Sequence, residues 1–156
     1  MNAPTATGRI EIDATPHAVY DLVSDPGKLS RLAEEYAGYR WVGALQGPAV
    51  GARFRGRNQR GFRRWSTLST ITDADAGCRF GFEVTSVGGL PVARWQYDFE
   101  PVGDGCVVVE SMWERRPTWF KVATSTVTGV WDREQTNTAN IAATLSRLKR
   151  AAEASR

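Results

Sequence analysis

The chain has 156 residues, of which 42% are hydrophobic and 24% are charged, an ordinary composition for one folded domain with its own core. The net charge of +3 is too small to indicate nucleic acid or an anionic membrane by itself. Cys78 and Cys106 lack metal-binding spacing, and His17 is the only histidine, which excludes a histidine-rich metal site. Neither a metal nor a cofactor is therefore expected.

The N-terminal part of the chain predicts one strand and two short helices. Residues 9–14 alternate between apolar and acidic side chains, as a half-buried strand does. Thr15-Pro16 and Asp25-Pro26 each combine a capping side chain with a proline at the first helical position. We expect a short helix after each of these pairs.

The middle of the chain reads as a series of strands joined by short turns. Six segments have the alternation or the composition of strands, with glycine, proline or aspartate between most of them. These segments are residues 40–45, 52–59, 63–72, 78–86, 92–100 and 106–114. Short connections between successive strands favour an antiparallel meander.

The hydrophobic period changes after Pro117. Apolar residues then recur at steps of three and four from Val127 to Ala152, which predicts an amphipathic helix of at least about 20 residues. Gly129 and the β-branched residues before it predict a kinked lead-in over residues 118–128. Because this helix can cover the apolar face of the sheet, the expected class is α+β, with about seven strands around one long C-terminal helix.

This order of elements and four local segments resemble the START-like superfamily (SRPBCC), also called the polyketide cyclase/dehydrase and lipid-transport family, and within it an actinobacterial cyclase-like branch. The resemblance covers nearly the whole chain and implies a helix-grip fold with a mostly apolar cavity between sheet and helix. It does not fix an activity, because the superfamily includes carriers, aromatases, cyclases and stress proteins. The segments are IEIDATPHAVYDLVSDPGKLSRL, GARFRGRN with RRWSTLSTITDADAGCRFGFEV, WQYDFEPVGDGCVVVES, and TGVWDR with NIAATLSRLKRAAE.

Aromatic side chains set the phase of the strands, because so many rings cannot all face water. The inward set is Phe54, Trp65, Phe80, Phe82, Trp95, Tyr97 and Phe99. With this phase Arg53, Arg55, Arg57 and Arg64 point outward, as on a solvated sheet face. Nucleic-acid binding would need exposed rings among these arginines, so nucleic acid is not an expected partner.

Polar residues at inward positions are the candidates for ligand contact, because a buried polar group needs a partner. They could equally satisfy one another in a core network. Glu110 is the most informative, because burial would raise its pKa and make it a general base or a hydrogen-bond partner for a ligand. The expected ligand-binding set is Phe54, Asn58, Trp65, Thr67, Ser69, Phe80, Phe82, Trp95, Tyr97, Glu110 and, from the long helix, Glu134 and Thr138.

Three functions are compatible with this pattern. The expected one is the binding of a small hydrophobic molecule, flat and polycyclic or lipid-like, by a carrier or sensor. The second is a cofactor-independent polyketide cyclase or aromatase that catalyses aldol condensation or dehydration. The third is an interaction module that binds an acidic partner through the arginine-rich sheet face. We expect a monomer or homodimer in the cytoplasm, since neither a signal peptide nor a membrane-spanning segment is visible.

Overall fold

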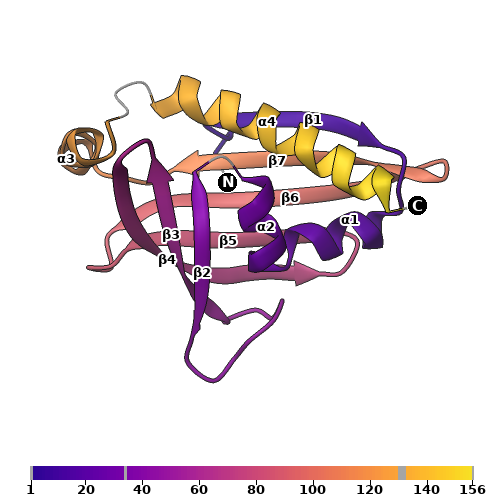
Figure 1. Ribbon diagram of the computed structural model, residues 1–156, viewed down its shortest axis with the longest axis horizontal. Helices are drawn as coiled ribbons and strands as arrows, with labels where there is room; N and C mark the ends of the chain where they lie inside the picture. Colours follow the sequence, from indigo (N-terminus) through magenta and orange to yellow (C-terminus); the bar gives the residue numbers. More distant parts are fainter. Residues whose placement is uncertain (1, 34, 130–132, 156) are drawn as a thin grey trace.

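The computed structural model describes residues 2–33, 35–129 and 133–155. Within them, seven strands form an antiparallel sheet in the order β1-β7-β6-β5-β4-β3-β2 (Figure 1). β2 to β7 form a meander in which successive strands are neighbours. β1 lies outside the meander, because it pairs with β7, the last strand along the chain. The strands are β1 (Ala6–Ile12), β2 (Tyr36–Val42), β3 (Arg53–Arg60), β4 (Arg63–Asp75), β5 (Arg79–Ser86), β6 (Pro91–Val102) and β7 (Gly105–Glu114).

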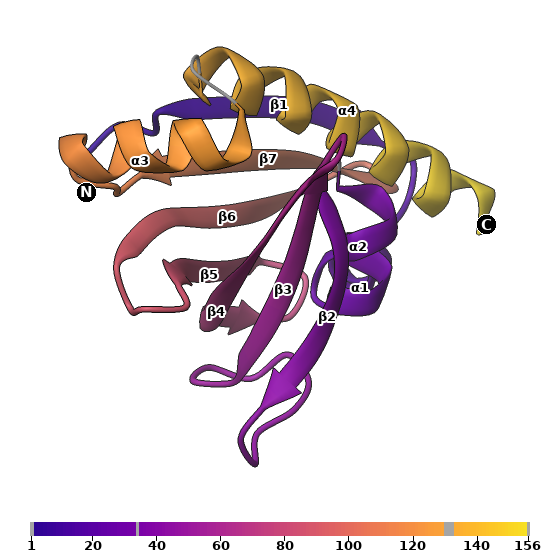
Figure 2. The same cartoon turned by 60° about the vertical axis from the view of Figure 1, so that its left-hand side comes forward.

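The helices lie on one side of a strongly curved sheet (Figures 1 and 2). α4 (Arg133–Ala154) runs beside β1, with α1 (Pro16–Val23) and α2 (Pro26–Leu32) near its C-terminal end. α3 (Thr118–Thr128) lies at the opposite end of the molecule. None of the described helices is long and apolar enough to cross a membrane. This arrangement confirms the expected α+β, helix-grip architecture.

Local signals account for the helix boundaries. Thr15 and Asp25 cap α1 and α2, and their side-chain oxygens accept hydrogen bonds from Ala18 N at 3.2 Å and Gly27 N at 2.8 Å. The expected lead-in before the long helix is instead a separate helix, α3. Gly129 caps the C-terminus of α3 with a φ of +76°, a backbone conformation that glycine adopts without strain.

β2 begins at Tyr36, four residues before the expected strand over 40–45. Ala37 and Gly38 weaken the strand signal between Tyr36 and Tyr39. The strand forms because Tyr36–Val42 pairs with β3, and Tyr36 lies opposite Asn58. Tertiary pairing therefore sets this boundary rather than local composition.

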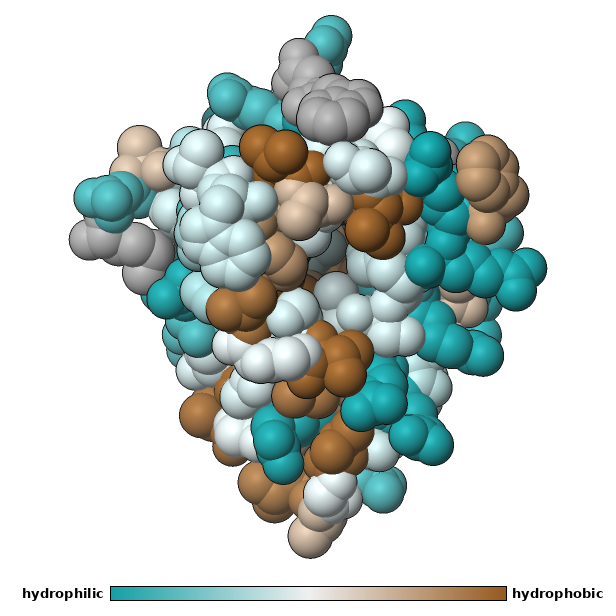
Figure 3. Space-filling view, turned by 90° about the vertical axis from the view of Figure 1, so that its left-hand side faces the viewer, coloured by the Kyte–Doolittle hydropathy of each residue, from teal (hydrophilic) through white to brown (hydrophobic). Residues whose placement is uncertain are grey.

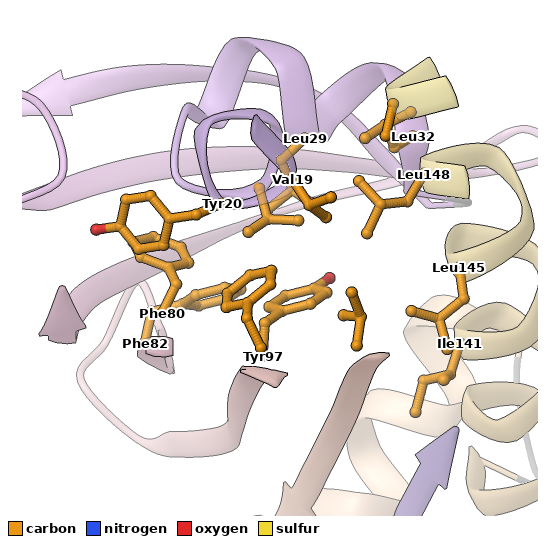
Figure 4. Close-up of a cluster of buried hydrophobic side chains, with 14 of the residues drawn as sticks. Val19, Tyr20, Leu29, Leu32, Phe80, Phe82, Tyr97, Ile141, Leu145 and Leu148 are labelled. Carbon is orange, nitrogen blue, oxygen red and sulfur yellow. The ribbon is translucent and has the colours of Figure 1, made fainter. Parts of the chain in front are cut away.

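Side chains fill the space between the sheet and the helices at the end of the molecule where α1 lies (Figure 4). The Tyr20 ring of α1 meets Phe80 and Phe99 edge-on, with ring centroids 6.1 Å and 5.9 Å apart. Val19 and Leu148 are fully buried and close this cluster from α1 and α4. This end of the molecule is a packed core.

The outer face of β3 matches the predicted strand phase. Arg53, Arg55 and Arg57 are exposed, whereas Phe54 and Gly56 between them are buried. Replacing the three arginines together by serine should therefore change the free energy of unfolding by less than about 1 kcal/mol per residue. Urea denaturation would measure the change, and a loss of several kcal/mol would show that the exposed arginines stabilise the fold.

Candidate functional site

A cavity of about 410 Å³ remains between the sheet, α3 and α4, beyond the packed core. Its volume lies in the range of about 300 to 1,000 Å³ that is usual for small-molecule sites. Figure 3 views the end of the molecule where α3 lies, and the surface there is hollowed near its centre. Its walls include the aromatic rings of Tyr36, Phe54, Trp65, Phe82, Trp95, Tyr97 and Phe120.

Nine of the twelve side chains predicted for ligand contact line this cavity, and contact with a ligand stays a prediction. They are Phe54, Asn58, Trp65, Thr67, Ser69, Phe82, Trp95, Tyr97 and Glu110. Phe80 does not line it, because two residues along β5 correspond to a displacement of roughly 7 Å, which takes the ring into the core beneath Tyr20.

The structure corrects the two positions expected from the long helix. Glu134 and Thr138 lie on the exposed side of α4, and the Thr138 hydroxyl donates a hydrogen bond to the Glu134 carbonyl oxygen at 3.0 Å. The cavity is instead lined by Asn140, Ile141 and Thr144. The members of the expected stripe at 130 and 131 lie outside the described residues. In the first turns of α4 the buried side chain is Asn137, so the face that packs inward there passes between Glu134 and Thr138 rather than through them.

Glu110 and Tyr97 form a buried polar pair on neighbouring strands. They lie directly opposite each other on β7 and β6, and each is only 2% exposed. The Tyr97 hydroxyl donates a hydrogen bond to Glu110 Oε1 at 2.7 Å, whereas Oε2 is buried without a partner. Burial raises the pKa of Glu110 to about 8, and the hydrogen bond from Tyr97 lowers it only in part. The carboxyl is therefore mainly protonated at neutral pH.

The raised pKa of Glu110 predicts a pH-dependent loss of stability. Between pH 4.5 and about 8 the unfolded chain loses the proton that the folded protein retains, so stability falls as pH rises. Glu110→Gln has no proton to lose there. We expect the free energy of unfolding of the variant, relative to that of the wild type, to rise by more than about 1 kcal/mol between pH 5 and pH 8. Parallel urea curves would measure this, and a constant difference would mean that Glu110 is ionised throughout.

Glu114 and Arg116 form an ion pair in the cavity wall. Arg116 Nε and Nη2 donate to the two carboxylate oxygens of Glu114 at 2.7 Å and 2.9 Å, and Nη1 donates to the Thr124 hydroxyl of α3. The Arg116 side chain is 6% exposed and that of Glu114 is 11% exposed. Burial acts to raise the pKa of Glu114, but the hydrogen bonds and charge of Arg116 outweigh it and the pKa is lowered.

A second ion pair lies where the α2–β2 connection meets α4. Arg133 Nη2 donates to Glu35 Oε2 at 3.0 Å, and Arg60 Nη1 donates to Glu35 Oε1 at 3.3 Å. The Arg133 guanidinium also lies 6.0 Å from the centre of a Trp65 ring. Both Glu35 and Arg133 line the cavity, so its charged groups come from β7, the β7–α3 connection, α4 and the chain just before β2.

The predicted set lacks several polar residues of the wall, among them Glu35, Tyr36, Glu114, Arg116 and Arg133. Glu114 could have been predicted from the two-residue period of the strand, because it lies on the same inward face as Glu110 and Met112. The others lie at the ends of elements or between them, where the period of a strand or helix does not predict which way a side chain points.

In the part of the chain that the structure describes, no group of three or more histidine, cysteine, aspartate or glutamate side chains is arranged to hold a metal ion.

A curved antiparallel sheet around a long C-terminal helix, with an apolar cavity between them, defines a helix-grip protein. The family model described as polyketide cyclase/dehydrase and lipid transport matches residues 3–153. The chain belongs to this family. No curated protein matches the chain.

Solved structures with the same fold include the polyketide-cyclase-like protein Cgl2372 from Corynebacterium glutamicum. It is 28% identical, with a TM-score of 0.63 over 97% of this chain and 93% of that one. The di-domain ARO/CYC protein StfQ from the steffimycin biosynthetic pathway is 14% identical, with a TM-score of 0.71 over 94% of this chain and 49% of its own. A protein from Deinococcus radiodurans is 15% identical, with a TM-score of 0.67 over 97% and 98%.

Proposed function

We propose that this protein binds a small, largely apolar molecule in the cavity between the sheet, α3 and α4, as a carrier or sensor. The observation that carries the proposal is the cavity itself. At the α1 end of the molecule, side chains fill the space between the sheet and the helices, whereas at the α3 end the space remains open. Its aromatic walls suit a flat ring system. The description of the family, which names both cyclisation and lipid transport, agrees with a ligand of this kind.

Trp65 and Trp95 provide a direct test, because both line the cavity and report on a bound aromatic molecule by a change in emission. We expect saturable quenching by neutral naphthalene derivatives at about micromolar affinity, on the order of −8 kcal/mol. Ala93→Phe should abolish it, because Ala93 is a buried residue of the cavity wall and a phenyl ring there occupies the ligand's space. Val84→Phe on the adjacent strand should act alike.

The matched control is Arg55→Ser, whose side chain lies on the outer face of the sheet. It should bind as the wild type does. The binding proposal fails if no naphthalene quenches the folded wild-type protein, or if the blocked variants bind as well as the control.

Catalysis by a polyketide cyclase or dehydrase is the second candidate, and the observation that favours it is Glu110. A buried carboxyl with a pKa near 8 can give or take a proton at neutral pH, as an aldol condensation or dehydration requires. If the protein is such an enzyme, Glu110→Gln should stop the cyclisation of a linear poly-β-ketone and leave its affinity nearly unchanged. Wild-type protein that never exceeds the spontaneous rate would exclude this activity for that substrate.

A further inference from the structure

We propose that the ligand of the cavity is uncharged and presents an acceptor oxygen, such as a ketone or quinone carbonyl, to Oε2 of Glu110. This inference rests on the proposed function and specifies the class of ligand. It separates neutral carbonyl compounds from fatty acids and other carboxylates, which an apolar cavity alone would not distinguish.

The first argument comes from unpaired polar atoms. Among the described residues, three buried side-chain polar atoms lack a hydrogen-bond partner: Glu110 Oε2, the Tyr36 hydroxyl and Arg94 Nε. Glu110 and Tyr36 both line the cavity, whereas Arg94 does not. Buried polar atoms are nearly always paired, so two unpaired ones in the wall of one cavity indicate that a bound molecule completes them.

The second argument concerns the direction of the hydrogen bond. Glu110 Oε1 already accepts a hydrogen bond from the Tyr97 hydroxyl at 2.7 Å. In a protonated carboxyl the remaining oxygen, Oε2, carries the hydrogen and therefore donates. The group that completes Oε2 must be an acceptor. A carbonyl oxygen beside an apolar body satisfies this requirement.

The surroundings of Glu110 keep it uncharged. Apart from burial, Tyr97 on β6 is the described residue whose interaction shifts the pKa of Glu110. Gly8 lies opposite it on β1, and α4 contributes the uncharged Ile141 and Thr144 to the same cavity. A ligand carboxylate here would bring a negative charge into an apolar site without a counter-charge, which is costly.

The third argument comes from the charged groups of the wall. Each described charged side chain that lines the cavity is paired with another: Glu114 with Arg116, and Glu35 with Arg133. Both arginines are held by two hydrogen bonds to their carboxylates. Neither arginine is available as the sole partner of a ligand anion, so these pairs also favour an uncharged ligand.

Three naphthalenes of similar size test the inference: 2-acetylnaphthalene with a carbonyl, 2-ethylnaphthalene without an acceptor, and 2-naphthoate with a charge. We expect wild-type protein at pH 6.5 to bind the ketone roughly three- to tenfold more tightly than the hydrocarbon, the range of one net hydrogen bond. The naphthoate should bind at least about tenfold more weakly than the ketone, because its charge must be desolvated.

Two variants locate the preference at Glu110. Glu110→Leu should bind 2-ethylnaphthalene at least as well as the wild type and lose the preference for the ketone. Glu110→Gln, whose amide nitrogen still donates, should keep it. In the wild type the preference should also decline above a pH of about 8, as Glu110 loses its proton, and in Glu110→Gln it should not.

A ketone preference that survives in Glu110→Leu would overturn the inference, as would tightest binding of the naphthoate. Equal affinity for the ketone and the hydrocarbon would do the same while leaving the proposed function intact. If none of the three binds to the wild type, the proposed function fails, and the inference fails with it.

Discussion

Arg116→Met should lower the free energy of unfolding by about 3–5 kcal/mol at pH 7, because it leaves the Glu114 carboxylate buried without its partner. Both of the oxygens of Glu114 accept hydrogen bonds from Arg116, and both side chains are almost fully buried. The arginine stem packs in the cavity wall, and methionine replaces much of its volume. The loss therefore comes mainly from the unpaired charge.

The contribution of Glu114 to the pH dependence of stability should change sign in this variant. In the wild type the pKa of Glu114 is lowered, so the pair stabilises above the unfolded value of about 4.5 and the gain is lost as pH falls. Without Arg116, burial raises the pKa of Glu114, and stability is lost as pH rises. The difference between the two proteins should therefore shrink toward acid pH in urea denaturation.

The neighbouring Arg115 is the matched control. It pairs with Glu83 at 2.7 Å, but both side chains are more than 40% exposed, so Arg115→Met should cost less than about 1 kcal/mol. The double variant Glu114→Gln/Arg116→Met should recover much of the loss, because it removes the buried charge. Equal effects of Arg115→Met and Arg116→Met would contradict a buried, stabilising pair.

Phe80→Ala should destabilise the protein by about 3–5 kcal/mol and leave the affinity for 2-acetylnaphthalene within about threefold of the wild type. Phe80 is 1% exposed and its ring packs against Tyr20 and Phe82, outside the cavity wall. Because the ring fills a packed core, its removal leaves a void there and no new space for the ligand.

Trp65→Ala should show the reverse pattern. Its ring lines the cavity and is only partly buried, so we expect a loss of about 1–2 kcal/mol in stability and at least about tenfold in affinity. Thermal unfolding measures the stability, and the naphthalene titration measures the affinity. Because Trp65 is absent from this variant, its titration is followed by the emission of the ligand. A Phe80→Ala protein that folds but no longer binds would show that the core and the binding site are not separate.

Local signals predicted the order of the elements and the α+β class, and the family resemblance supplied the helix-grip fold. Thr15-Pro16 and Asp25-Pro26 marked the two short helices, and the alternating aromatic residues fixed which face of each strand is buried. The predicted strand boundaries were less accurate where pairing sets them, as at Tyr36. The break at Gly129 was visible, but the sequence did not tell a kink from the end of a helix.

The site was partly predictable, for a physical reason. Period 2 places inward side chains on strands, so Asn58, Tyr97 and Glu110 were identified from their phase. The period does not show where along a strand the cavity ends, and for this reason the predicted ligand-binding set included Phe80. Arg116 and Arg133 reach the cavity from the ends of elements, and only tertiary structure brings them to their carboxylates.

The central claim is that the cavity holds an uncharged ligand whose acceptor oxygen meets Glu110. A crystal structure of the protein soaked with 2-acetylnaphthalene at pH 6.5 tests it most directly. We predict the naphthalene rings between the sheet, α3 and α4, with the ketone oxygen roughly 2.5–3.0 Å from Glu110 Oε2. Rings on the outer face of the sheet, or in the cavity with the ketone turned away from Glu110, would contradict the account.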